Sequence, residues 1–133
     1  MKKTSNKVDW QTAPDIFAQI KRIVQKLNLW HIDPHKIFCF RSKYSQTRAR
    51  ARIWSLPRIW QQALNINPYY IIEVISERFD RLSVSDQKRV LIHELMHIPK
   101  TFSGSLVPHR GKYHRIDHQT VELLFQKFLR GCF

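Results

Sequence analysis

The sequence predicts an α+β domain in which an N-terminal helix packs on a small β-sheet and two further helices follow. The length of 133 residues matches one domain. Apolar residues recur at helical spacing near both ends of the chain and again before Pro99. Between the first two helical segments lie short runs of alternating or β-branched residues, which favour strands. We therefore expect a single domain over residues 1–133.

The first predicted element is a helix over residues 14–27. Its apolar residues repeat at helical spacing: Ile16, Ile20, Ile23, Val24 and Leu27. Thr12 and Asp15 have the spacing of a capping box, with Pro14 in the first turn. Residues 1–11 are polar and are expected to be flexible.

Two or three strands are expected in the middle of the chain. Residues 37–40 and 69–75 are rich in β-branched and aromatic side chains. In the segment 47–54, arginines alternate with apolar residues, which predicts a strand with one buried and one charged face. Residues 57–64 are expected to form a short helix or a loop.

Two more helices are predicted in the second half. Ser83 and Asp86 have the pattern of an N-terminal cap, and the helix that they open ends before Pro99. It ends there because the residue before a proline is pushed out of helical geometry. A long connection over 99–115 then leads to a last helix over 117–129.

The composition limits the partners and the compartment. Lys and Arg number 23 against 10 Asp and Glu, and the net charge of +13 indicates a negatively charged partner or surface. Cys39 and Cys132 are expected to be free thiols in a reducing compartment. No apolar run suits a signal peptide or a spanning helix. We expect a cytoplasmic protein without membrane contact.

The motif H-E-L-M-H carries the strongest chemical signal. His93 and His97, four positions apart, lie on one face of the predicted helix, so both imidazoles can bind one Zn²⁺. Glu94 lies about 100° around the helix from His93. There it can act as general base on a zinc-bound water without binding the metal. The alternatives are a buried histidine pair without metal and a closed, non-catalytic metal site.

A catalytic zinc site needs a third protein ligand and an open position. The candidates are His109, His114, His118 and the carboxylate of Glu122. We favour His109, because Pro108 and Gly111 bracket a turn that can return over the helix. Ser103 stands where a metzincin has its third histidine, so that class is excluded. The expected cofactor is one Zn²⁺ per chain.

Five short motifs lie in order between residues 48 and 124: R-A-R-A-R-I-W-S-L-P, L-I-H-E-L-M-H-I-P, F-S-G-S-L, P-H-R-G and T-V-E-L-L. In these motifs the chain resembles a metallopeptidase family found in phages and archaea and, more distantly, the SprT-like zincins. His93, Glu94 and His97 match the family's motif directly, and His109 matches its downstream histidine. An arginine separates that histidine from the following glycine, where the family pattern has none.

The resemblance implies a minimal zincin-like fold and a zinc metallopeptidase that hydrolyses proteins or peptides. In such an enzyme Glu94 takes a proton from the zinc-bound water and passes it to the leaving amine. Arg110, Tyr113 and His114 are candidate donors to the oxyanion. An extended substrate is expected to add to an edge strand beside the metal helix.

A second class of function is binding of DNA or RNA. Arg48, Arg50 and Arg52 would form a positive stripe on one face of the sheet. The aromatic residues expected to stack on bases are Trp54, Trp60, Tyr69 and Tyr70. The alternative to an enzyme is therefore a basic nucleic-acid-binding protein with a structural metal. Glu94 distinguishes the two, because a closed site has no use for it. The oligomeric state stays open.

Overall fold

The computed structural model describes residues 7–111 and 115–131. Four strands form one sheet in the order β1-β2-β4-β3. Their bounds are β1 (Asp9–Thr12), β2 (Ile37–Lys43), β3 (Ala51–Ser55) and β4 (Tyr70–Ile75). β2 and β4 run parallel, whereas β1 and β3 are antiparallel to their neighbours. β1 and β3 therefore form the two edges of the sheet.

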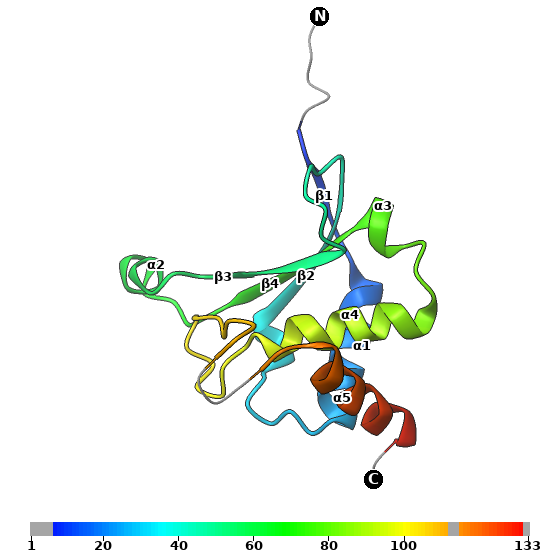
Figure 1. The fold of residues 1–133 in the computed structure, drawn as a ribbon. Helices are drawn as coiled ribbons and strands as arrows, with labels where there is room; N and C mark the ends of the chain where they lie inside the picture. The colour runs from blue at the N-terminus through cyan, green and yellow to red at the C-terminus, as the bar shows by residue number, and fades with distance from the viewer. Residues whose placement is uncertain (1–6, 112–114, 132–133) are drawn as a thin grey trace, which may run out of the picture.

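The helices lie mainly on one side of this sheet. Their bounds are α1 (Pro14–Lys26), the 3₁₀ turn η2 (Pro34–Lys36), α2 (Arg58–Leu64), α3 (Ser76–Phe79), α4 (Val84–Met96) and α5 (His118–Arg130). α1 and α4 cover one face of the sheet, and α5 packs on α4 (Figure 1). The predicted α+β class is confirmed. Within the described ranges, no helix has the length and apolarity that a bilayer crossing requires.

The core lies between the sheet and the helices. Tyr70, Ile72 and Val74 alternate along β4 toward the helices and are fully buried. Leu91 and Leu95 of α4 are equally buried, and burial of each such side chain contributes about 1.5–3 kcal/mol. α4 is therefore held firmly against the sheet.

The cysteine prediction holds for the described part of the chain. Cys39 is a buried free thiol in β2, and burial raises its pKa to about 12. Cys132 lies outside the described residues.

The expectation of a flexible segment over 1–11 is wrong for its last residues. Asp9–Thr12 form β1, in which Trp10 pairs with Ser42 of β2. All four side chains of β1 are exposed. The strand therefore has no buried face, and its sequence lacks the apolar alternation that would have indicated it. Residues 1–6 lie outside the described part.

The capping box predicted at Thr12 and Asp15 is also wrong. The N-cap of α1 is Ala13, and no side chain caps the helix. Asp15 instead accepts two hydrogen bonds from the Arg41 guanidinium, at 3.0 and 3.1 Å. The cap predicted at Ser83 is confirmed, because its hydroxyl accepts a hydrogen bond from the backbone N–H of Asp86 at 3.1 Å.

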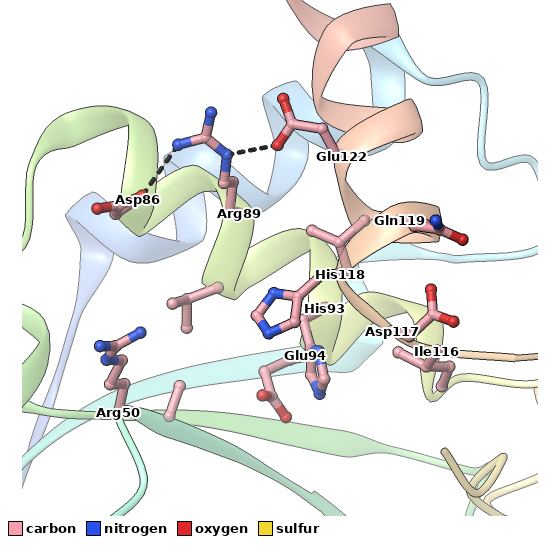
Figure 2. Close-up of a pocket in the computed structure, with 13 residues that line it drawn as sticks. Arg50, Asp86, Arg89, His93, Glu94, Ile116, Asp117, His118, Gln119 and Glu122 are labelled. Carbon is pink, nitrogen blue, oxygen red and sulfur yellow. Dashed lines mark hydrogen bonds and ion pairs between the residues drawn. The ribbon is translucent and has the colours of Figure 1, made fainter. Parts of the chain in front are cut away.

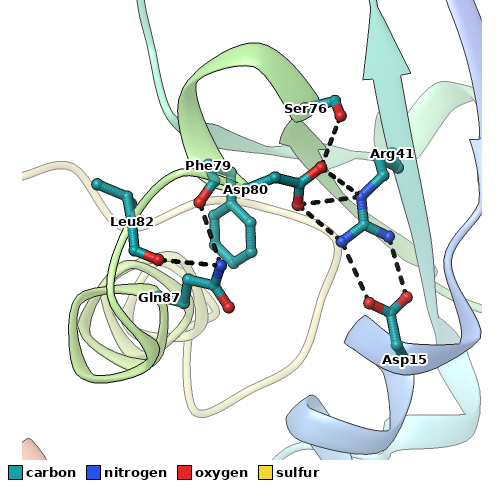
Figure 3. Close-up of polar contacts among 7 residues, drawn as sticks. All are labelled: Asp15, Arg41, Ser76, Phe79, Asp80, Leu82 and Gln87. Atoms are coloured by element: carbon teal, nitrogen blue, oxygen red, sulfur yellow. Dashed lines mark hydrogen bonds and ion pairs between the residues drawn. The ribbon is translucent and has the colours of Figure 1, made fainter.

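Arg41 joins three elements of the fold (Figure 3). From β2 it reaches Asp15 on α1 and Asp80 just after α3, with a shortest distance of 2.9 Å to Asp80. Ser76 donates a further hydrogen bond to Asp80 at 2.6 Å. The hydrogen bonds from Arg41 hold the pKa of Asp15 below its usual range. Burial alone would raise the pKa of Asp80, but the hydrogen bonds from Arg41 and Ser76 hold it below its usual value.

We expect Arg41→Met to lower the free energy of unfolding by about 2 kcal/mol at pH 7, because it removes charge-assisted hydrogen bonds to two carboxylates. Both folded-state pKa values are lowered, so this stabilisation exists above the unfolded pKa of about 3.9 and disappears as the pH falls. Urea unfolding at pH 7 and pH 3 measures the effect. Lys43→Met, at an exposed position of the same strand, is the control. If Arg41→Met lowered the free energy of unfolding by the same amount at pH 7 and pH 3, this explanation would be wrong.

The charged strand predicted over 47–54 is only partly formed. β3 begins at Ala51, so Arg48 and Arg50 precede it. Arg52 does not belong to a free basic stripe, because it pairs at 2.8 Å with the fully buried carboxylate of Glu73. Burial alone would raise the pKa of Glu73, but the hydrogen bond from Arg52 holds it below its usual value.

Candidate metal centre

The last turn of α4 carries the two histidines of the sequence motif. Leu91, Ile92 and Leu95 are buried against the core. This leaves the side of the helix that bears His93 and His97 for other contacts. His97 is the C-cap residue of the helix, which ends before Pro99 as predicted.

Three imidazoles converge at this helix end. The ligand atoms of His93, His97 and His109 all lie within 4.8 Å of one another. The Nε2 atoms of His93 and His109 face each other at 3.1 Å. Two nitrogens bound to a tetrahedral Zn²⁺ at about 2.0–2.1 Å would lie about 3.3–3.4 Å apart. The three side chains therefore fit one such ion with little rearrangement, and they could hold a metal.

His97 is oriented by a backbone carbonyl. Its Nδ1 lies 2.6 Å from the carbonyl oxygen of Val107, to which the Nδ1–H donates. The N–H of Val107 in turn donates to the carbonyl of His97 at 2.7 Å. A hydrogen bond of this kind fixes the tautomer of a metal-binding histidine and leaves its Nε2 lone pair toward the metal. The same pair of bonds fixes the chain two residues before His109.

The loop between α4 and Val107 is anchored to the sheet by Tyr70. The Tyr70 hydroxyl accepts a hydrogen bond from the N–H of Gly104 and donates to the carbonyl of Ser105, both at 2.8 Å. Gly104 has a φ of +94°, and a Cβ there would meet the carbonyl oxygen of Leu56 at 2.9 Å. Tyr70, predicted to stack on bases, is therefore a buried residue that positions this loop.

Glu94 is a buried carboxylate beside the histidines. Its side chain is only 8% exposed, and among the residues that the structure describes we find no hydrogen-bond donor to it. Burial raises the pKa of Glu94 to about 8. Burial, followed by the neighbouring histidines, lowers the pKa of His93 to about 4. At neutral pH His93 is thus uncharged, which is the form that binds a metal. A largely buried carboxylate with a raised pKa at the wall of a cleft marks a candidate functional group.

A cleft of about 720 Å³ opens beside His93 and Glu94. Its walls come from the start of β3, from α4 and from the first turns of α5 (Figure 2). At one end Arg89 forms ion pairs with Asp86 and Glu122, both at 2.9 Å. The cleft is large enough for a side chain of a substrate.

The other candidate ligands have different positions. His118 is the first residue of α5 and lines the cleft, but it does not belong to the group of converging ligand atoms. Glu122 is paired with Arg89. Arg110 is exposed and forms a β-bridge with Arg115. His114 and Tyr113 lie outside the described residues.

Comparison with known proteins gives one finding. The model of a family described as putative phage metallopeptidase matches residues 8–124. The chain belongs to this family. No curated protein and no solved structure matches this chain. The matched region includes every strand that the structure describes and the three converging histidines.

Two features of the site lie outside the H-E-L-M-H motif. Val107 acts only through its backbone, so no residue type signals its role. The pairing of Arg89 with both Asp86 and Glu122 depends on how α5 crosses α4. The spacing of three residues between Asp86 and Arg89 within one helix does indicate an ion pair between them.

Proposed function

We propose that the protein is a zinc-dependent peptidase in which Glu94 is the general base. One observation supports this proposal: the largely buried carboxylate of Glu94 lines a cleft together with His93, one of three converging imidazoles. A structural metal site is closed by four protein ligands. Among the described residues, no fourth His, Cys, Asp or Glu joins the group.

The residues then have distinct roles. His93, His97 and His109 would hold the metal ion, and the Val107 carbonyl keeps the His97 ring in place. Zinc held there would supply Lewis-acid chemistry and would lower the pKa of a bound water toward 7. Glu94 accepts a proton from the attacking water and delivers it to the leaving amine.

The edge strand β3 is our candidate for the substrate-binding strand. β3 lies at the edge of the sheet beside α4. An extended peptide can add to such an edge through backbone hydrogen bonds. A side chain next to the scissile bond would then enter the cleft between β3 and α5.

Removal of the metal tests this function. We expect dialysis against a chelator to abolish cleavage of a denatured protein substrate, and stoichiometric Zn²⁺ to restore it, because the histidines alone supply no nucleophile. Cleavage is followed by mass spectrometry of the products. Mg²⁺ is the control, because it prefers oxygen ligands over imidazole. Cleavage that persists in fully metal-free protein would contradict the proposal.

A further inference from the structure

The face of the sheet that points away from α1 and α4 carries apolar side chains and one arginine. We call it the outer face and define it by Phe38, Phe40, Ile71, Trp54 and Arg52. The strand registers align Phe38 with Ile71 and Ile71 with Trp54, so this row crosses three neighbouring strands. In Figure 1, α1, α4 and α5 all lie on the other side of the sheet.

Two aromatic rings of this row are open to solvent. Phe38 is 50% exposed and Trp54 is 45% exposed. They lie two strand spacings apart, at about 9–10 Å. Tyr69 contacts Phe38 with a distance of 5.6 Å between ring centroids. Exposed aromatic rings that are spread across adjacent strands of a sheet are a common platform for unstacked bases.

The Trp54 ring is held in place by buried polar groups. Its indole N–H donates to Glu73 at 2.8 Å, and the Arg52 guanidinium lies 4.9 Å from its ring centroid. Arg52 is itself fixed by the ion pair with Glu73. Two planar groups are therefore already ordered on the outer face, and a ligand that stacks there loses little protein entropy.

The positive charge of the chain favours a negatively charged ligand for the outer face. Arg58 begins α2 three residues after β3, and Arg48 lies in the connection that leads into β3. Both are exposed, and neither forms an ion pair with any residue in the described ranges. The whole chain carries a net charge of +13. Exposed aromatic rings on a strongly positive chain, with the exposed Arg58 just beyond the end of β3 that carries Trp54, match bases joined by phosphates.

We propose that the outer face binds single-stranded nucleic acid. Bases stack on Phe38 and Trp54, and a phosphate contacts Arg58. This surface lies on the side of the sheet that faces away from α4, the helix of the candidate metal centre (Figure 1). The proposal does not depend on the peptidase activity.

Fluorescence anisotropy with a labelled oligothymidylate of about 12 nucleotides tests this, since one platform of this type covers about 4–16 nucleotides. We expect Phe38→Ala to weaken binding about tenfold, within the range for loss of one stacking contact. Phe38→Tyr keeps a ring and should bind like wild type. Trp30→Ala is the matched control, because Trp30 is 75% exposed and lies in the connection between α1 and η2, outside the strands of the sheet.

Salt dependence separates stacking from charge. Arg58→Ala should reduce the slope of log K against log salt by about one unit and leave the preference for single strands unchanged. Circular dichroism confirms that each variant is folded. Equal weakening by Phe38→Ala and Trp30→Ala, or duplex DNA bound as well as the single strand, would overturn the proposal. A wild-type dimer in sedimentation that Phe38→Ala dissociates would also overturn it, because a second copy would then cover the outer face.

Discussion

Glu94→Gln should reduce peptide hydrolysis about 10³-fold while zinc remains bound. Glutamine has the shape of glutamate but cannot accept the proton of the attacking water, and general base catalysis contributes about 10²–10⁴ in rate. The variant should be at least as stable as wild type, because it replaces a buried carboxylate that has no donor among the described residues. Product formation and zinc content are measured on the same sample.

Glu122→Gln is the matched control for this experiment. Glu122 lines the same cleft but is paired with Arg89, so its loss should change the rate by only a few-fold. If Glu94→Gln cleaves as fast as wild type, Glu94 is not the base. If it loses zinc as well as activity, Glu94 acts as a ligand and the proposed division of roles is wrong.

His109→Ala should weaken zinc binding by at least about 100-fold. Loss of a partner that only orients a ligand typically costs 10–100-fold, and His109 would supply a bond to the metal itself. The ring nitrogens of His109 and His93 face each other at 3.1 Å, so the variant leaves two ligands and no third of the same kind. Competition with a chromophoric chelator measures the affinity, and mass spectrometry gives the stoichiometry.

His118→Ala tests whether zinc binding depends on a histidine outside the converging group. His118 lines the cleft but lies outside that group, so zinc should bind to this variant as to wild type. His114→Ala tests a candidate that the structure does not describe. Retention of zinc by His109→Ala together with its loss from either of the other two would reassign the third ligand.

The chemistry of the candidate site followed from local spacing. The i, i+4 relation of His93 and His97 needs only a helix, and α4 contains apolar residues that make it one. His109 was preferred because a proline and a glycine bracket its turn. The structure brings this histidine to the other two, whereas His118, which has the same chemistry, lines the cleft outside that group.

The misplaced parts of the fold depend on partners distant in sequence. β1 is exposed along its whole length, so only its hydrogen bonds to β2 define it. Asp15 could serve as a cap residue in isolation, but Arg41 provides a stronger partner from another element. The arginine stripe was overestimated because a single carboxylate in β4, within an otherwise apolar run, takes Arg52. Such pairings are set by strand register, which a short sequence pattern does not contain.

The double hydrogen bond between His97 and Val107 has a consequence for how fast the protein can take up its metal. It closes a loop across ten positions. The chain therefore loses the entropy of loop closure when it folds and not when the metal binds. His109 follows only two residues later, so its side chain can occupy only a small volume near the other two histidines. The apoprotein should therefore capture zinc in one rapid second-order step, without a slow unimolecular phase in stopped-flow mixing.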